Sequence, residues 1–124
     1  MCGITAYIGN KNPVPILLKG LKRLEYRGYD SSGFALLQKD EVTCIKKKGK
    51  VASLESFINN EDMDSNIGIA HTRWATHGEP NDINAHPHLD HTGKIALVHN
   101  GIIENHEVLK EVLITKGISF ISDT

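Results

Sequence analysis

The sequence predicts an α+β fold, built from short strands and amphipathic helices that do not repeat along the chain. Three features indicate this class. The N-terminal segment CGITAYIG, residues 2–9, carries β-branched and aromatic residues. Residues 13–26 carry apolar side chains at helical spacing. Two apolar runs, 33–38 and 42–47, are joined by the polar residues 39–41, as in a hairpin.

The helix predicted over 13–26 is amphipathic, and its charged side chains lie mostly away from the apolar face. Either Pro13 or Pro15 suits the first turn, where a missing N–H costs nothing. The apolar face is formed by Ile16, Leu17, Leu21 and Leu24.

Further along, residues 51–58 (VASLESFI) are compatible with a short helix. IGIAHT at 67–72 and KIALVH at 94–99 have the composition of strands. A long polar loop, residues 72–92, separates the two and carries several histidines.

The last predicted helix begins at Asn105, which can cap it, and Glu107 suits its positive N-terminal end. Gly117 is placed to end the helix in a left-handed conformation. Residues 118–122 (ISFIS) then predict a strand, and the chain stops directly after it. Residues 1–124 are therefore expected to be part of one domain, truncated within it.

Composition narrows the class of protein. Hydrophobic residues make up 40% and charged residues 23% of the chain, and the net charge is -1. This balance offers no electrostatic reason to expect nucleic acid or an anionic membrane as a partner. No apolar run approaches the roughly 20 residues of a membrane span, and the N-terminus lacks the basic start and long apolar stretch of a secretory signal. Two cysteines, Cys2 and Cys44, form no disulfide framework, which favours a reducing cytoplasm.

Cys2 is a candidate nucleophile. Initiator methionine is usually removed before a small residue, which would place a thiol and a free α-amino group on Cys2. An α-amino group has a pKa of about 7.7–8.0, so it can take the thiol proton near neutral pH. The alternatives are a small buried side chain at a strand start, or S-acylation, which one acyl chain without a polybasic segment supports poorly.

Asn100 and Gly101 follow a predicted strand. An Asn-Gly pair in this place is more often a tight turn. Its side-chain and backbone N–H groups can also converge on one oxygen and stabilise a tetrahedral oxyanion, and losing one such donor typically costs about 10²–10³ in rate.

Arg73 lies in the segment HTRWATHGEP at 71–80, where a strand is expected to end. Its planar guanidinium could bind a carboxylate through two hydrogen bonds. The same segment is equally compatible with a surface loop that contains one buried Trp.

Histidines and lysines raise two weaker possibilities. His86, His88 and His91 suggest a metal, but Pro87 interrupts their spacing and no acidic or thiol ligand pattern accompanies them, so no metal is expected. The lysine-rich run at 46–50 is interpreted as a solvated hairpin end.

Taken together, these signals match a known family. The blocks, in order, closely resemble the glutaminase (type 2 glutamine amidotransferase) domain of glucosamine-6-phosphate synthases, also called glutamine–fructose-6-phosphate aminotransferases (isomerizing). The resemblance covers essentially the whole chain. Its blocks are MCGI at 1–4, YRGYDSSG at 26–33, HTRWATHG at 71–78, NAHPH at 84–88 and HNGIIENH at 99–106.

The resemblance implies an N-terminal nucleophile hydrolase fold, an αββα four-layer sandwich of which this chain would supply roughly the first half. It implies that Cys2 is the nucleophile, with its own α-amino group as the base. It also implies that Asn100 and Gly101 form the oxyanion hole.

For the substrate, the resemblance implies that Arg73, Thr76 and His77 bind glutamine, with Arg73 on its α-carboxylate. Trp74 would lie in the loop that closes over glutamine and gates the passage of ammonia. The family also uses an aspartate for the α-amino group of glutamine. The chain ends one residue before that position, so Asp123 is not given this role.

The implied function is glutamine hydrolysis that supplies ammonia for converting fructose 6-phosphate to glucosamine 6-phosphate, the first step of amino-sugar and UDP-N-acetylglucosamine synthesis. No cofactor is implied. The implied partners are L-glutamine and a C-terminal sugar-isomerase domain of the same chain, in a cytoplasmic homodimer. The 124 residues alone are expected to be inactive.

Two alternatives stay open. One is the glutaminase domain of another Cys-start amidotransferase, such as the purine-pathway phosphoribosyl amidotransferase. That family has Gln-Glu where this chain has Tyr29 and Asp30, and Tyr-Ser where it has Trp74 and Ala75. The other is a non-catalytic interaction module that keeps the fold without turnover. Intact Cys2, Arg73 and Asn100 argue against such a module, although truncation would make this fragment catalytically silent.

Overall fold

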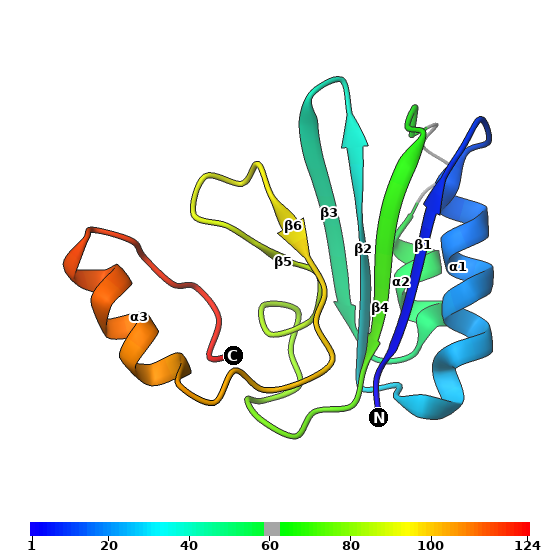
Figure 1. Ribbon diagram of the computed structural model, residues 1–124. Coiled ribbons are helices and arrows are strands. Elements are labelled where there is room, and N and C mark those ends of the chain that lie inside the picture. Colours follow the sequence, from blue (N-terminus) through cyan, green and yellow to red (C-terminus); the bar gives the residue numbers. More distant parts are fainter. Residues whose placement is uncertain (59–62) are drawn as a thin grey trace.

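A computed structural model describes residues 1–58 and 63–124 (Figure 1). The predicted N-terminal strand and helix are confirmed as β1 (Gly3–Ile8) and α1 (Pro13–Leu24). The side chain of Asn12 accepts a hydrogen bond from the backbone N–H of Val14 at 3.1 Å, which caps the helix. Pro13 occupies the first turn, where its missing N–H would have had no partner within the helix.

The predicted hairpin is also confirmed, as β2 (Ser31–Gln38) and β3 (Glu41–Lys48). Its loop is one residue shorter than expected, because Glu41 already pairs with Gln38. Lys39 and Asp40 make the turn with positive φ angles of 46° and 68°. Such a turn has a twist that matches the twist of the flanking strands.

These strands belong to one antiparallel sheet of order β1-β4-β2-β3, in which β4 is Ile67–Arg73. The strand predicted at 67–72 is therefore confirmed and lies between β1 and β2. Because β1 and β4 run in opposite directions, the start of β1 lies beside the end of β4. Several predicted site residues, among them Cys2 and Arg73, lie at this end of the sheet.

Two helices cover the same face of the sheet (Figure 1): α1 and the confirmed short helix α2 (Val51–Phe57). Their apolar side chains pack against alternate residues of the central strands. Each fully buried leucine contributes roughly 1.5–3 kcal/mol to folding. The core consists of Val14, Leu17, Leu18, Leu21, Phe34, Leu36, Val51, Leu54, Met63 and Ala70.

The opposite face of the sheet is partly apolar and exposed. Since side chains alternate along a strand, the residues next to those facing the helices point the other way, among them Ile4, Ile8, Leu37 and Ile67, which are 38–78% exposed. In an αββα sandwich, a second sheet packs on this face. The described residues supply one helical layer, this four-stranded sheet and a second sheet of only two strands.

The C-terminal third differs from the prediction. KIALVH pairs only through β6 (Ala96–Leu97), with β5 (His88–Leu89). The strand predicted at 118–122 is wrong, because these residues are irregular. A strand needs a neighbour to satisfy its backbone groups, and in the part of the chain that the structure describes no strand pairs with this segment.

The last helix, α3, is His106–Thr115. Asn105 precedes it as predicted, but its side chain makes no capping hydrogen bond, so that detail is wrong. Gly117 ends the helix with a φ of +84°, as expected. Within the described structure, α3 buries none of its side chains, and it lies apart from the helices that cover the main sheet (Figure 1).

One further finding concerns membranes. Among the described residues, no helix has both the length and the apolar character needed to cross one.

Candidate active site

Cys2 lies immediately before β1, beside the end of β4. Its Sγ accepts a hydrogen bond from the backbone N–H of Trp74 at 3.3 Å and lies 3.7 Å from the Trp74 carbonyl oxygen, to which the thiol can donate. The antiparallel register, in which Gly3 faces Thr72, places these two segments together. The side chain of the predicted nucleophile, Cys2, therefore contacts the backbone of the predicted gating residue, Trp74.

Asn100 reaches the same point from the far part of the chain. Its Nδ2 donates to the carbonyl oxygen of Cys2 at 3.1 Å. Its Oδ1 lies 2.7 Å from Nε2 of His71, on β4. Asn100 and Gly101 lie in a bend rather than a hairpin turn. The turn interpretation of this pair therefore does not describe the structure.

An open cavity of about 240 Å³ lies at this junction. It is lined by the predicted nucleophile Cys2, by the predicted oxyanion donors Asn100 and Gly101, and by Met1 and Arg27, which were given no role in catalysis. With Met1 in place, the free α-amino group belongs to Met1. The base predicted for Cys2 exists only after Met1 is removed.

Arg73 is 4% exposed, at the end of β4. Its guanidinium donates to the carbonyl oxygens of His77, of Gly78 at 3.0 Å and of Glu79 at 3.3 Å. Arg73 therefore holds the loop that follows β4 in place. The structure brings Arg73 together with His77, another predicted glutamine ligand, through the backbone of His77.

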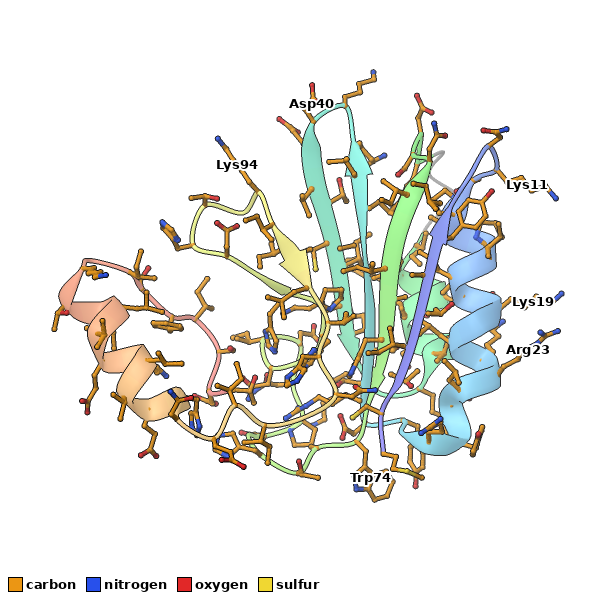
Figure 2. The ribbon with its side chains drawn as sticks, viewed as in Figure 1. Lys11, Lys19, Arg23, Asp40, Trp74 and Lys94 are labelled. Carbon is orange, nitrogen blue, oxygen red and sulfur yellow. The ribbon has the colours of Figure 1, made fainter. Side chains whose placement is uncertain are left out.

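Trp74 is 48% exposed, and Figure 2 shows it at the end of the sheet where the N-terminus lies. The interpretation of this segment as a surface loop around a buried Trp is therefore wrong. The indole packs edge-on against Tyr29, with ring centroids 5.7 Å apart. Next to it, the backbone N–H of Ala75 donates to the carboxylate of Asp30. Thr76, like His77, is exposed.

Gly28 allows this close packing. A Cβ at this position would lie 2.8 Å from the backbone carbon of Arg73 and 2.8 Å from the nitrogen of Trp74. Any larger residue would push the segment before β2 away from the loop that carries Trp74. The segment 26–33 thus packs directly against the backbone of the loop that carries Trp74.

Asn84 is fully buried and ties the C-terminal segment to the site loop. Its Oδ1 accepts from the backbone N–H of Asp123 at 2.9 Å, and its Nδ2 donates to Asp123 Oδ2 at 3.2 Å and to the Glu79 carbonyl at 3.0 Å. Thr124 also lies close to Gly78. The chain therefore returns to the loop that Arg73 holds. Sequence reasoning did not assign Asn84 a role.

The lysine run at 46–50 is not a solvated hairpin end, which corrects the sequence interpretation. Lys46 donates to the carbonyl oxygen of Ile83 at 2.9 Å, and Lys47 forms an ion pair with Asp82 at 3.1 Å. The backbone N–H of Lys48 donates to the same carboxylate at 2.6 Å. The run fastens the loop before β5 onto β3.

Three histidine rings pack in a row, in which His86 stacks on His71 and meets His88 edge-on. His71 and His86 lie 4.2 Å apart with nearly parallel rings, and His88 lies 4.3 Å from His86. Burial, together with the neighbouring ring charges, lowers the pKa of His86 to about 3, and burial and the charge of Lys46 lower that of His88 to about 4. Within residues 1–58 and 63–124, no group of His, Cys, Asp or Glu side chains could hold a metal ion.

This stack predicts an acid-sensitive fold. Because the folded-state pKa values of about 3 and 4 for His86 and His88 lie below the ordinary 6.5, the unfolded chain binds more protons below pH 6.5. The stabilisation is fully present above pH 6.5 and is lost as pH falls towards 4. Each ring contributes at most about 1.4 kcal/mol per pH unit, less because both are partly exposed to solvent.

The measurement is denaturant unfolding between pH 7 and 4.5. His86→Phe, which keeps a stacked ring but cannot titrate, should reduce the pH dependence of the free energy of unfolding. His91→Gln, at an exposed position, is the matched control. An unchanged pH dependence in His86→Phe would contradict the prediction.

Comparison with known proteins bears on the family and on the fold. No family model matches the chain. Curated relatives nevertheless match all of it. Glutamine–fructose-6-phosphate aminotransferases [isomerizing] of Bacteroides thetaiotaomicron and Caldanaerobacter subterraneus are 58% and 56% identical to it, and the match covers 100% of this chain and 20% of each relative.

Solved structures show the same fold. A glutamine phosphoribosylpyrophosphate amidotransferase from B. subtilis, complexed with ADP and GMP, superposes with a TM-score of 0.81 at 24% identity, covering 98% of this chain and 26% of that one. A structure described as the allosteric regulatory enzyme of purine biosynthesis gives a TM-score of 0.76 at 26% identity, covering 96% of this chain and 26% of that one.

The fold is that of a glutamine amidotransferase domain of the N-terminal nucleophile class. Within this class, the sequence matches extend over the entire chain at 52–58% identity. Over its whole length the chain is therefore similar to glutamine–fructose-6-phosphate aminotransferases, and it spans about a fifth of the length of these curated relatives.

Proposed function

We propose that this chain is the glutamine-hydrolysing part of a glutamine–fructose-6-phosphate aminotransferase, with residues 1–124 forming part of its glutaminase domain. The observation that carries the proposal is the placement of the Asn100 side chain against Cys2, 98 positions away along the chain. An amide donor on one residue and a thiol on another, both lining one cavity, are the minimum arrangement that acyl transfer needs.

The proposed reaction begins with Cys2 as the N-terminal residue. Its α-amino group takes the thiol proton, and the sulfur attacks the side-chain amide carbon of glutamine. Nδ2 of Asn100 and the backbone N–H of Gly101 stabilise the negative oxygen of the tetrahedral intermediate. The ammonium group then returns its proton to the leaving nitrogen, and ammonia departs. Water hydrolyses the thioester to glutamate and restores the thiol.

We assign glutamine binding to Arg73, Thr76 and His77. A guanidinium has five N–H donors, and Arg73 donates to three carbonyl oxygens, which leaves donors for the α-carboxylate of glutamine. Thr76 and His77 are exposed on the loop that Arg73 holds. That loop can therefore present both side chains to a substrate bound at Arg73.

Trp74 is assigned the gating role. The half-exposed indole packs edge-on against Tyr29, while Asp30 accepts a hydrogen bond from the adjacent backbone N–H of Ala75. A fixed backbone with a loosely packed ring lets the indole change position without unfolding the loop.

For the complete protein, we propose that a sugar-isomerase domain uses the ammonia to convert fructose 6-phosphate to glucosamine 6-phosphate, within a cytoplasmic homodimer. The relatives at 52–58% identity support this acceptor. The likeness to the phosphoribosylpyrophosphate amidotransferase, at 24% identity, supports the shared fold alone.

The test is an assay of the full-length protein, with removal of Met1 verified by intact mass. We expect glutamate release from glutamine, and glucosamine 6-phosphate when fructose 6-phosphate is supplied. Formation of phosphoribosylamine from phosphoribosyl pyrophosphate instead would move the chain to the purine-pathway branch. Absence of glutamate release would overturn the proposal.

A further inference from the structure

His71 contacts the proposed oxyanion donor from inside the fold. It lies on β4, on the sheet face opposite α1 and α2, and is 1% exposed. Its Nε2 is 2.7 Å from Oδ1 of Asn100. A carbonyl-type oxygen can only accept, so the histidine donates this hydrogen bond.

The two hydrogen bonds of Asn100 determine which way its amide faces. Oδ1 accepts from His71, and Nδ2 donates to the Cys2 carbonyl oxygen at 3.1 Å. Rotating the amide by half a turn would set its oxygen against a carbonyl and its NH₂ against an N–H, and both contacts would be repulsive. Asn100 itself lies exposed in an irregular segment. Because His71 is buried and Asn100 is exposed, the histidine is the residue that fixes the orientation of the Asn100 amide.

The ring of His71 is held in one state. Burial is the main cause that lowers its pKa, and the charge of Arg73 acts in the same direction, against the hydrogen bond to Asn100. The ring is then neutral at neutral pH, with its proton on Nε2. Its Nδ1 is buried without a hydrogen-bond partner among the described residues. His86 stacks on the ring face at 4.2 Å and fixes its plane.

We propose that His71 is a positioning residue of the glutaminase reaction, which orients the Asn100 amide so that its NH₂ faces Cys2 at the cavity that both residues line. This inference rests on the proposed function of Cys2 and Asn100. It assigns no contact between His71 and substrate. The class of ligand is unchanged: the side-chain amide of glutamine and the oxyanion derived from it.

The test compares two replacements in the full-length, Met-processed protein. His71→Phe keeps a ring for the stack and removes the donor, and His71→Gln restores an N–H donor. We expect kcat to fall about tenfold in His71→Phe, the rate equivalent of one hydrogen bond, with little change in KM, and to recover in His71→Gln. In an Asn100→Ala background, His71→Phe should cause no further loss.

That last comparison separates positioning from folding, because a merely structural role would add its loss to that of Asn100→Ala. Full kcat in His71→Phe, or additive losses, overturns the inference while leaving the proposed function intact. A wild-type protein without glutamate release contradicts the proposed function instead. The ¹⁵N spectrum of labelled histidine decides the inference without turnover: a proton on Nε2 of His71 supports it, and a proton on Nδ1 overturns it.

Discussion

Cys2→Ala should abolish glutamate release by the full-length protein, while synthesis of the amino sugar from added ammonia continues. Alanine removes the sulfur that forms the thioester and leaves the α-amino group and oxyanion donors in place. Removing a nucleophile that acts with its base as one unit typically lowers kcat on the order of 10⁶-fold. Glutamate formation and ammonia-dependent synthesis, measured side by side, check both parts of the expectation.

Cys44 supplies the matched control. It lies in β3, partly buried, with its Sγ 3.7 Å from the carbonyl oxygen of Pro87. Burial raises the pKa of its thiol, against the charge of Lys46, so it is a poor nucleophile at neutral pH. Cys44→Ala should keep glutaminase activity. Glutamate release that persists in Cys2→Ala, or disappears in Cys44→Ala, would show that the wrong thiol has been assigned.

The main sheet could be predicted because its elements carry strong local signals. Alternating β-branched residues predicted β1, a leucine face behind Pro13 predicted α1, and two apolar runs predicted the hairpin of β2 and β3. Each of these elements contributes side chains to, or packs against, a hydrophobic core that is formed by the described residues. Local preference and burial point to the same structure here.

The strand predicted for ISFIS at 118–122 was wrong because a strand needs a neighbouring strand, and none of the described strands pairs with this segment. Phe120 and Ile121 are 43% and 86% exposed. β-propensity records how well a side chain fits the half-buried surface of a sheet, and among the described residues no strand pairs with this segment. Local sequence cannot report whether the neighbouring strand is present.

For the candidate site, the sequence proposed residue types but could not give their geometry. The sequence singled out Cys2 and Asn100, but their contact depends on the strand order, which joins segments 98 positions apart. The role of Asn84 was not predicted, because a buried amide that ties one loop to another has no local signature. Similarly, nothing in the spacing of the histidines indicates that His71 and His86 stack.

Asn100→Ala should lower kcat for glutamine hydrolysis by about 10²–10³, equivalent to roughly 2.7–4 kcal/mol of transition-state stabilisation. The Nδ2 group faces the carbonyl of Cys2, at the edge of the cavity in which the oxyanion would form. A donor aimed at developing charge acts mainly in the transition state, so KM for glutamine should change little. Steady-state kinetics with the full-length protein, after removal of Met1, give both constants.

Asn105→Ala is the matched control for this replacement. Asn105 is an exposed asparagine just before α3, and its side chain makes no capping hydrogen bond, so its loss should leave kcat and KM unchanged. A raised KM at an unchanged kcat in Asn100→Ala would assign Asn100 to ground-state binding of glutamine. Because Asn100 also bonds His71, that outcome would reassign the histidine as well, from orienting a catalytic donor to supporting a binding pocket.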